Sequence, residues 1–113
     1  MTLLEIFEKV NLVIPIEQRH FFNYFNDSVD ELIATFGYFV LDSEGEYTPP
    51  KDLSDSVAVL PLYHTAIVDN IIFLAGSGQD EMRKSEFLRK AKAAYLKYWN
   101  DHAKGKRVKR MRW

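Results

Sequence analysis

The sequence has no cysteine and no long hydrophobic run. Without cysteine there are no disulfide bonds, thiolate metal ligands or cysteine nucleophiles, so packing alone must hold the fold together. The longest strongly apolar stretch lies around residues 71–75, far short of a membrane span. The N-terminus also lacks the basic flank and long apolar run of a signal peptide. We therefore expect a soluble protein, or a soluble part of a larger one.

Motifs of catalysis and of cofactor binding are also missing. The chain contains no phosphate loop, dinucleotide fingerprint, serine-centred elbow or pair of catalytic carboxylates. Its histidines, His20, His64 and His102, are scattered and have no partner at metal-ligand spacing. The sequence therefore predicts a protein that is not an enzyme and has no cofactor or bound metal.

The composition is that of one folded domain. Of the 113 residues, 47% are hydrophobic and 14% are aromatic. A chain of this length and composition can bury a hydrophobic core, and it is too apolar for intrinsic disorder.

Acidic and basic residues are unevenly distributed along the chain. Residues 104–113 carry six Lys and Arg and no acidic residue, whereas residues 1–103 carry nine Lys and Arg against sixteen Asp and Glu. The net charges of +6 and −7 are hidden in a total of −1. We expect a domain over residues 1–103 and a basic C-terminal arm over 104–113. Such an arm should bind an anionic surface of nucleic acid, of another protein or of another copy of this chain.

Two helices are expected in the first third of the chain. Thr2 and Glu5 have the spacing of a capping box, which predicts a short amphipathic helix that ends near Pro15. Pro15 is well placed to open the second helix. Apolar residues then recur at three- and four-residue steps over residues 21–36, and Gly37 is expected to end that helix in a left-handed conformation.

The middle of the chain predicts less regular structure. Residues 38–41 and 46–48 read as two short strands of a β-hairpin or as a loop insertion, and residues 57–60 read as an extended segment. From Pro61 to residue 75 apolar residues cover nearly the whole circumference of a helix, which is typical of a central, buried element. The glycines in 76–78 should end it.

A last helix is expected over residues 79–103, with one broad apolar face. That face comprises Met82, Phe87, Leu88, Ala91, Ala94, Tyr95, Tyr98 and Trp99. The predicted fold class is therefore mainly α, a small bundle of about four helices. A hairpin or loop insertion follows the second helix, and an extended basic arm follows the last.

Three residues of the central helix are candidates for contacts between subunits, namely Tyr63, His64 and Asp69. His64 is most simply a partly buried or interface histidine. Asp69 interrupts an apolar surface, and two interpretations of it remain open. It lies either on a solvated edge, which is the favoured interpretation, or in the interior beside an arginine of the same or another chain.

The basic arm is the strongest candidate for partner binding. Its terminal tryptophan could anchor it in a pocket, because Trp and Arg dominate interface hot spots. The alternative is a passive, disordered end. The candidate partner-binding residues are Lys104, Lys106, Arg107, Lys109, Arg110, Met111, Arg112 and Trp113. Tyr95, Tyr98 and Trp99 could stack on bases if they were exposed beside the arm, but their helical spacing favours core packing.

The order of these elements resembles that of the small head–tail connector (adaptor) proteins of tailed bacteriophages. The similarity rests on the opening Leu3–Phe7, on the run Leu60–Ala75, in which Leu-Pro and Tyr63 lead into an apolar helix, and on Phe87–Tyr95 with its Ala-x-x-x-Tyr spacing. It covers most of residues 1–103. A strongly basic C-terminal end is not a general feature of that family.

The resemblance implies a structural virion protein. Such a subunit assembles into a ring, commonly twelve-fold, under the portal at the neck of the virion. Its partners would be the portal protein, tail or neck proteins and further copies of itself, with non-specific contact to packaged DNA and no membrane. Assembly would take place in the host cytoplasm. The alternative, from another class, is a small helical nucleic-acid-binding regulator that uses the arm on phosphates, although the acidic body would repel a duplex.

Overall fold

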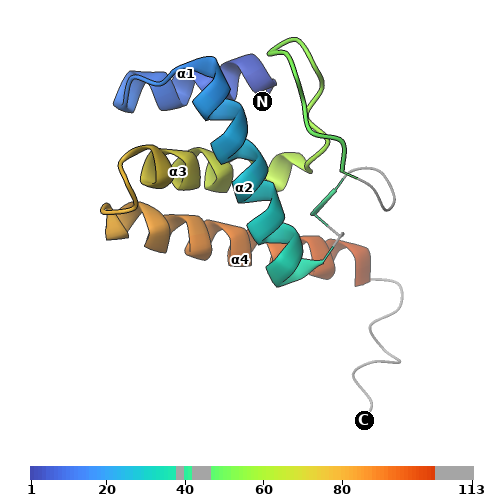
Figure 1. Ribbon diagram of the computed structural model, residues 1–113. Coiled ribbons are helices and arrows are strands. Elements are labelled where there is room, and N and C mark those ends of the chain that lie inside the picture. Colours follow the sequence, from blue (N-terminus) through green and yellow to red (C-terminus); the bar gives the residue numbers. More distant parts are fainter. Residues whose placement is uncertain (38–39, 42–46, 104–113) are drawn as a thin grey trace.

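The computed structural model describes residues 1–37, 40–41 and 47–103, with side chains up to residue 100. In this part of the chain the protein is mainly helical, with four α-helices and no strand, as Figure 1 shows. The elements are α1 (Leu3–Val13), α2 (Gln18–Phe36), the 3₁₀ turn η2 (Pro61–Tyr63), α3 (His64–Ala75) and α4 (Glu81–Ala103). The predicted helical class is therefore confirmed for the described residues.

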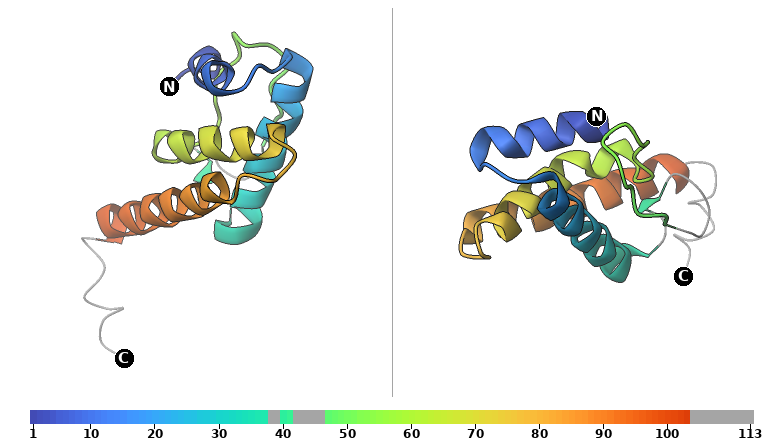
Figure 2. Two further views of the ribbon diagram at one scale, coloured as in Figure 1. Left: turned by 90° about the vertical axis from the view of Figure 1, so that its left-hand side faces the viewer. Right: turned by 45° about the horizontal axis from the view of Figure 1, so that its top comes forward.

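Helix α3 is the centre of the molecule. Helices α1 and α4 lie on opposite sides of it, and α2 crosses over the stack that these three helices form (Figures 1 and 2). Helix α3 contacts all three of the others. Its buried residues point to several sides, which confirms the prediction of a central helix: His64, Ala66, Ile67, Asp69, Asn70, Ile71 and Ile72.

The start of α1 is fixed by its predicted capping box. The Glu5 N–H donates to Thr2 Oγ1 at 3.1 Å, and the Thr2 N–H donates to Glu5 Oε1 at 2.8 Å. Hydrogen bonds from the Thr2 backbone and side chain hold the pKa of the Glu5 carboxyl below its usual value. The capping box therefore satisfies two N–H groups that have no partner within the helix.

The connection between α1 and α2 is longer than predicted. Pro15 does not open α2, because the extended backbone continues to Glu17 and α2 begins at Gln18. The Ile16 N–H donates to Asn11 Oδ1 at 3.0 Å, so a side chain of α1 holds this connection in place. The prediction for Pro15 was wrong because a local side-chain hydrogen bond decides the path here.

Helix ends at glycine were predicted more accurately. Gly37 ends α2 with φ 81° and ψ −174°, and its N–H donates to Ile33 O at 2.7 Å. Its positive φ confirms the need for glycine, although its ψ is extended rather than left-handed helical.

Helix α4 begins at Glu81, two residues later than expected. Asp80, just before it, accepts the Arg83 N–H through Oδ1 at 3.2 Å and so satisfies an N–H group of the first turn.

The predicted hairpin falls largely on residues outside the described ones, 38–39 and 42–46, and stays a prediction. Among the described residues, Leu41 and Val59 form an isolated antiparallel bridge. The Leu60 N–H donates to Val40 O at 2.8 Å. The extended segment before α3 is thus joined to the residues that follow α2.

The predicted apolar face of α4 needs correction. Phe87, Ala91 and Ala94 are buried against the core as expected, but Met82 is 79% and Leu88 is 49% exposed. Positions 87, 91 and 94 follow the helical period and face α3, whereas 82 and 88 lie on other sides of the helix. Helix α4 therefore has an outer face with uncovered apolar side chains. Among the described residues, no helix has the length and apolarity that crossing a membrane requires.

Candidate functional site

A pair of ionic contacts to Asp69 is enclosed where α4 packs on α3. Asp69 is only 3% exposed. Its Oδ1 accepts from Arg83 Nη1 at 2.9 Å, and its Oδ2 accepts from Lys90 Nζ at 2.6 Å. Arg83 and Lys90 lie seven residues apart, two turns along the same face of α4. The favoured interpretation of Asp69 as a solvated residue was wrong, and the alternative of a buried acid with basic partners in the same chain is confirmed.

A second polar chain runs from α3 to α2. Asn70 is fully buried, and its Nδ2 donates to Ser28 Oγ at 2.9 Å. The Ser28 hydroxyl donates in turn to the backbone carbonyl of Tyr24 at 2.8 Å. These bonds satisfy polar groups that would otherwise be costly to bury. A serine within the apolar stripe of α2 was the sequence signal for this contact, and our prediction missed it.

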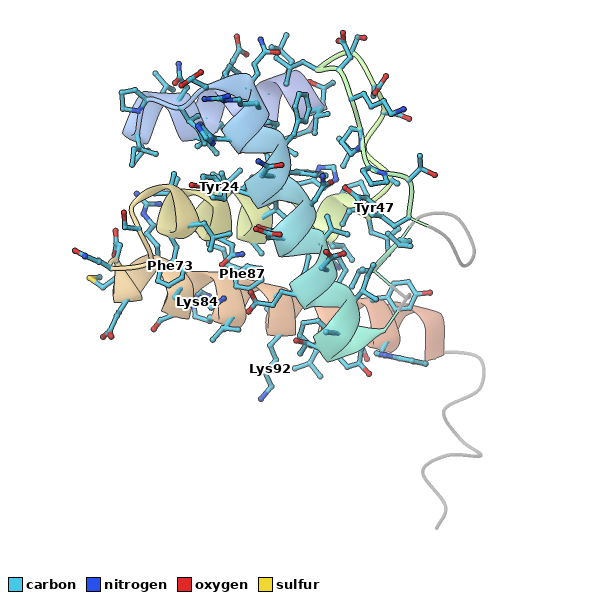
Figure 3. The ribbon with its side chains drawn as sticks, viewed as in Figure 1. Tyr24, Tyr47, Phe73, Lys84, Phe87 and Lys92 are labelled. Atoms are coloured by element: carbon cyan, nitrogen blue, oxygen red, sulfur yellow. The ribbon has the colours of Figure 1, made fainter. Side chains whose placement is uncertain are left out.

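Lys84 extends the polar chain at Asn70 to α4. Its Nζ donates to both carboxylate oxygens of Glu31, at 2.6 and 2.7 Å, and to Asn70 Oδ1 at 3.2 Å. The ammonium group also lies over the rings of Phe73 and Phe87, at 5.4 and 4.8 Å from their centroids (Figure 3). A single lysine of α4 thus binds α2 and α3 together.

The network fixes how three helices sit against one another. Its buried charges have opposite charges as partners, so its chemistry is that of a structural clamp. A shift of α4 along α3 by one turn would separate Asp69 from Arg83 and Lys90. The contacts of Arg83, Lys84 and Lys90 were not predicted, because basic residues at these positions are typical of the solvent-exposed face of a helix.

His64 ties two distant segments to α3. It is 4% exposed, its Nε2 lies 2.8 Å from the Val59 carbonyl oxygen, and its Nδ1 lies 3.0 Å from the amino nitrogen of Met1. An Nε2–H tautomer donates to Val59 and accepts from Met1. His64 was interpreted as a partly buried or interface histidine, and within the subunit it is buried and hydrogen-bonded.

Tyr63 is fully buried beside α4 and the end of α2. Its ring centroid lies 6.3 Å from that of Phe36, and its hydroxyl oxygen has no hydrogen-bond partner among the described residues. Burial raises the pKa of Tyr63 to about 12, and Tyr95 and Tyr98 add to the rise. Tyr63, His64 and Asp69 are thus all packed inside one subunit, and their role between subunits stays a prediction.

The aromatic residues of α4 pack on each other and on α2. Tyr95 stacks on Phe36 at 4.8 Å between centroids, and Trp99 meets Tyr95 edge-on at 6.2 Å and Tyr98 at 6.0 Å. All three side chains of α4 are half-buried. This arrangement agrees with the core-packing interpretation.

The arm lies outside the described residues, and with it the whole predicted set of partner-binding side chains from Lys104 to Trp113. Among the described residues there is no group of three or more His, Asp or Glu side chains that could hold a metal ion. A surface hollow of about 520 Å³ opens between the N-terminal end of α1 and the segment before α3. Its lining includes Leu4, Leu53 and Val57, which make part of it apolar.

Comparison of the chain with protein-family models, with curated proteins and with solved structures finds no match. Function is therefore inferred from the residues and the fold of the chain itself.

Proposed function

We propose that this protein is a structural virion protein, a head–tail connector of a tailed bacteriophage. Copies of it assemble into a ring that joins the portal to the tail at the neck of the virion. Its partners are the portal protein, tail or neck proteins and further copies of itself.

The order of the helices is the observation that carries this proposal. Helix α1 opens with Leu3–Phe7, η2 leads through Pro61 and Tyr63 into α3, and α4 buries Ala91 in the core. These are the segments on which the resemblance to connector proteins rests, and each lies in a helical element or at its start. The fold agrees with the helical-bundle subunit that the resemblance implies.

The charge distribution supports an assembly role. Residues 1–103 have a net charge of −7 and residues 104–113 a net charge of +6. Two regions of opposite charge on one chain favour contacts between copies or with an acidic partner. Weak contacts that are repeated around a ring add up by multivalency.

The test is assembly with the portal protein encoded in the same genome. Purified chain and purified portal rings are mixed, and the products are examined by sedimentation velocity and electron microscopy. We expect an additional ring on one end of the portal. Failure to bind the portal at any concentration at which the chain stays folded would overturn the proposal.

Duplex DNA is the second arm of the test. A nucleic-acid-binding regulator would bind free duplex with a steep salt dependence, roughly 0.9 units of log K per log salt for each phosphate contact. A connector should show only weak, non-specific binding. Tight, sequence-selective DNA binding without portal binding would favour the regulator.

A further inference from the structure

The outer face of α1 carries a short exposed stripe. Leu4, Glu8 and Leu12 follow one another at four-residue steps and lie away from the side on which α1 buries Leu3 and Val10. Leu4 is 46% and Leu12 is 86% exposed, and Glu8 is exposed between them. The stripe is thus two uncovered leucines with a carboxylate at the centre.

Helix α4 carries a second stripe with the same spacing. Leu88, Lys92 and Leu96 also follow at four-residue steps, and Leu88 is 49% and Leu96 is 56% exposed. Lys92 points away from the rest of the molecule, below α4 in Figure 3. This stripe is two uncovered leucines with an ammonium group at the centre.

The two central charges have no partner among the residues that the structure describes. Within residues 1–37, 40–41 and 47–100, neither Glu8 nor Lys92 forms a hydrogen bond or an ion pair. Other charged side chains on the surface of α4 have a partner within the helix. Glu86 is an example, because its Oε2 lies 2.7 Å from Arg89 Nη2. The stripes therefore offer both apolar surface and an uncompensated charge to a partner.

The stripes complement each other in length, apolarity and charge. Eight residues of α-helix span about 12 Å, so the two leucines of one stripe are as far apart as those of the other. Because each charge lies midway between its leucines, Glu8 meets Lys92 whether the two helices run parallel or antiparallel. Leucines then cover leucines on either side of the ion pair.

We propose that the outer face of α1 in one copy of the protein docks on the outer face of α4 in the next copy. Helices α1 and α4 lie on opposite sides of α3 (Figures 1 and 2), so each subunit offers one stripe to each of two neighbours. Such a head-to-tail contact joins different surfaces, and repeated it closes into a ring or continues as a filament. The hollow beside Leu4 gives a leucine of the neighbouring α4 a recess to enter.

This contact supplies the subunit interface of the proposed ring, and its biological meaning rests on that proposed function. The contact itself is a property of the chain and is tested without portal. One contact between two short stripes is small, so we expect weak pairwise association that ring closure reinforces.

Cross-linking tests which surfaces meet. The chain has no cysteine, so Lys9→Cys and Ala93→Cys each introduce a single reactive thiol. Both positions are exposed beside a stripe, and both variants keep Glu8 and Lys92. With a short bis-maleimide, a mixture of the two variants should give mainly K9C–A93C dimers, well above either variant alone. Asp27→Cys on the exposed side of α2 is the matched control and should cross-link poorly with A93C. Equal yields for all pairs, or no cross-linking at high protein concentration, would overturn the proposal.

Blocked variants test the head-to-tail direction. The double variant Glu8→Lys with Leu12→Asp blocks the α1 stripe, and Lys92→Glu with Leu96→Asp blocks the α4 stripe. Each should stay monomeric in sedimentation velocity, while their equimolar mixture should form dimers that grow no further, because one intact stripe of each kind remains. Circular dichroism should show both variants folded, since all four side chains are exposed.

The outcomes separate this proposal from the proposed function. If each blocked variant assembles like the unmodified chain, or if their mixture stays monomeric while the unmodified chain associates, the contact is wrong. Such a chain could still bind portal by other surfaces. Stripe-dependent association without portal binding would uphold the contact and overturn the connector function.

Discussion

At the scale of single residues, stability depends on a few buried polar groups that satisfy one another. Asp69 is nearly inaccessible, yet its partners Arg83 and Lys90 keep about a third of their side-chain surface in water. Long basic side chains can bury their stems and leave part of the charge hydrated. Asp69 is therefore the member of the network that loses most hydration on folding. Its removal leaves Arg83 and Lys90 without their negative partner.

Replacement of Asp69 should show this directly. Asp69→Asn keeps the shape but removes the charge, and we expect it to destabilise the fold by about 2–3 kcal/mol. This is less than the roughly 3–5 kcal/mol for a fully buried pair, because the cations are partly solvated. Glu86→Gln, which breaks the exposed pair with Arg89, is the control and should cost less than about 1 kcal/mol. Urea unfolding followed by circular dichroism measures both, and equal losses would contradict the network.

The hydroxyl of Tyr63 gives a prediction of opposite sign. It is buried and has no hydrogen-bond partner in the part of the chain that the structure describes, and a buried unsatisfied group costs about 1–3 kcal/mol. Tyr63→Phe should therefore raise the free energy of unfolding, by about 1 kcal/mol. Tyr47→Phe is the control, because it removes the 2.5 Å hydrogen bond to Asn26 Oδ1 and should destabilise by a similar amount. A destabilised Tyr63→Phe would mean that the hydroxyl has a partner.

At the scale of elements, the helix ends depend on a few backbone conformations. Gly37 ends α2 with φ 81° and ψ −174°, a region that side chains strongly disfavour. Gly76, after α3, has the ordinary φ of −87°, and an added Cβ would meet nothing closer than Ile72 O at 3.4 Å. Two glycines at equivalent positions therefore have different importance.

Replacement of each glycine by alanine should have different effects on stability. We expect Gly37→Ala to cost about 1–3 kcal/mol from backbone strain. Gly76→Ala should change stability by less than about 1 kcal/mol, because it also reduces the entropy of the unfolded chain. Thermal unfolding of both variants measures the difference, and comparable shifts in Tm would show that α2 can end in another way.

The sequence predicted elements better than contacts. Thr2 with Glu5, Gly37 and the apolar run after Pro61 each specify local structure through their own backbone. These predictions hold, except that Gly37 ends α2 with an extended ψ and not in the left-handed helical conformation. Asp69 was misjudged because its partners lie on another helix, fourteen and twenty-one residues away. Leu88 was misjudged because its position relative to α3 depends on how α4 packs. Long-range packing, unlike capping or periodicity, leaves little trace in a local pattern.

At the scale of the whole molecule, we propose that two parts of the chain bind partners. The stripes on α1 and α4 are rigid helix faces that suit a second copy of the chain. Residues 104–113 carry charge of one sign with no acid among them, which suits an anionic partner. A connector needs both kinds of contact, one within its ring and one to the next component of the neck.

Removal of residues 104–113 should separate these two functions. Among the described side chains, those that α4 packs against its neighbours end near Trp99, so we expect the truncated chain to keep its helical circular dichroism spectrum and its unfolding midpoint. It should also keep the association that depends on Glu8 and Lys92, because both stripes remain.

Attachment of the truncated chain to portal should fall sharply. Trp113→Ala alone should weaken this attachment by on the order of 2 kcal/mol if Trp113 is an interface hot spot. Neutralising single lysines of the arm should instead slow association and reduce its salt dependence. Sedimentation of portal with each variant measures attachment. Normal attachment by the truncated chain would assign portal binding to the helical body and leave the arm to the packaged DNA.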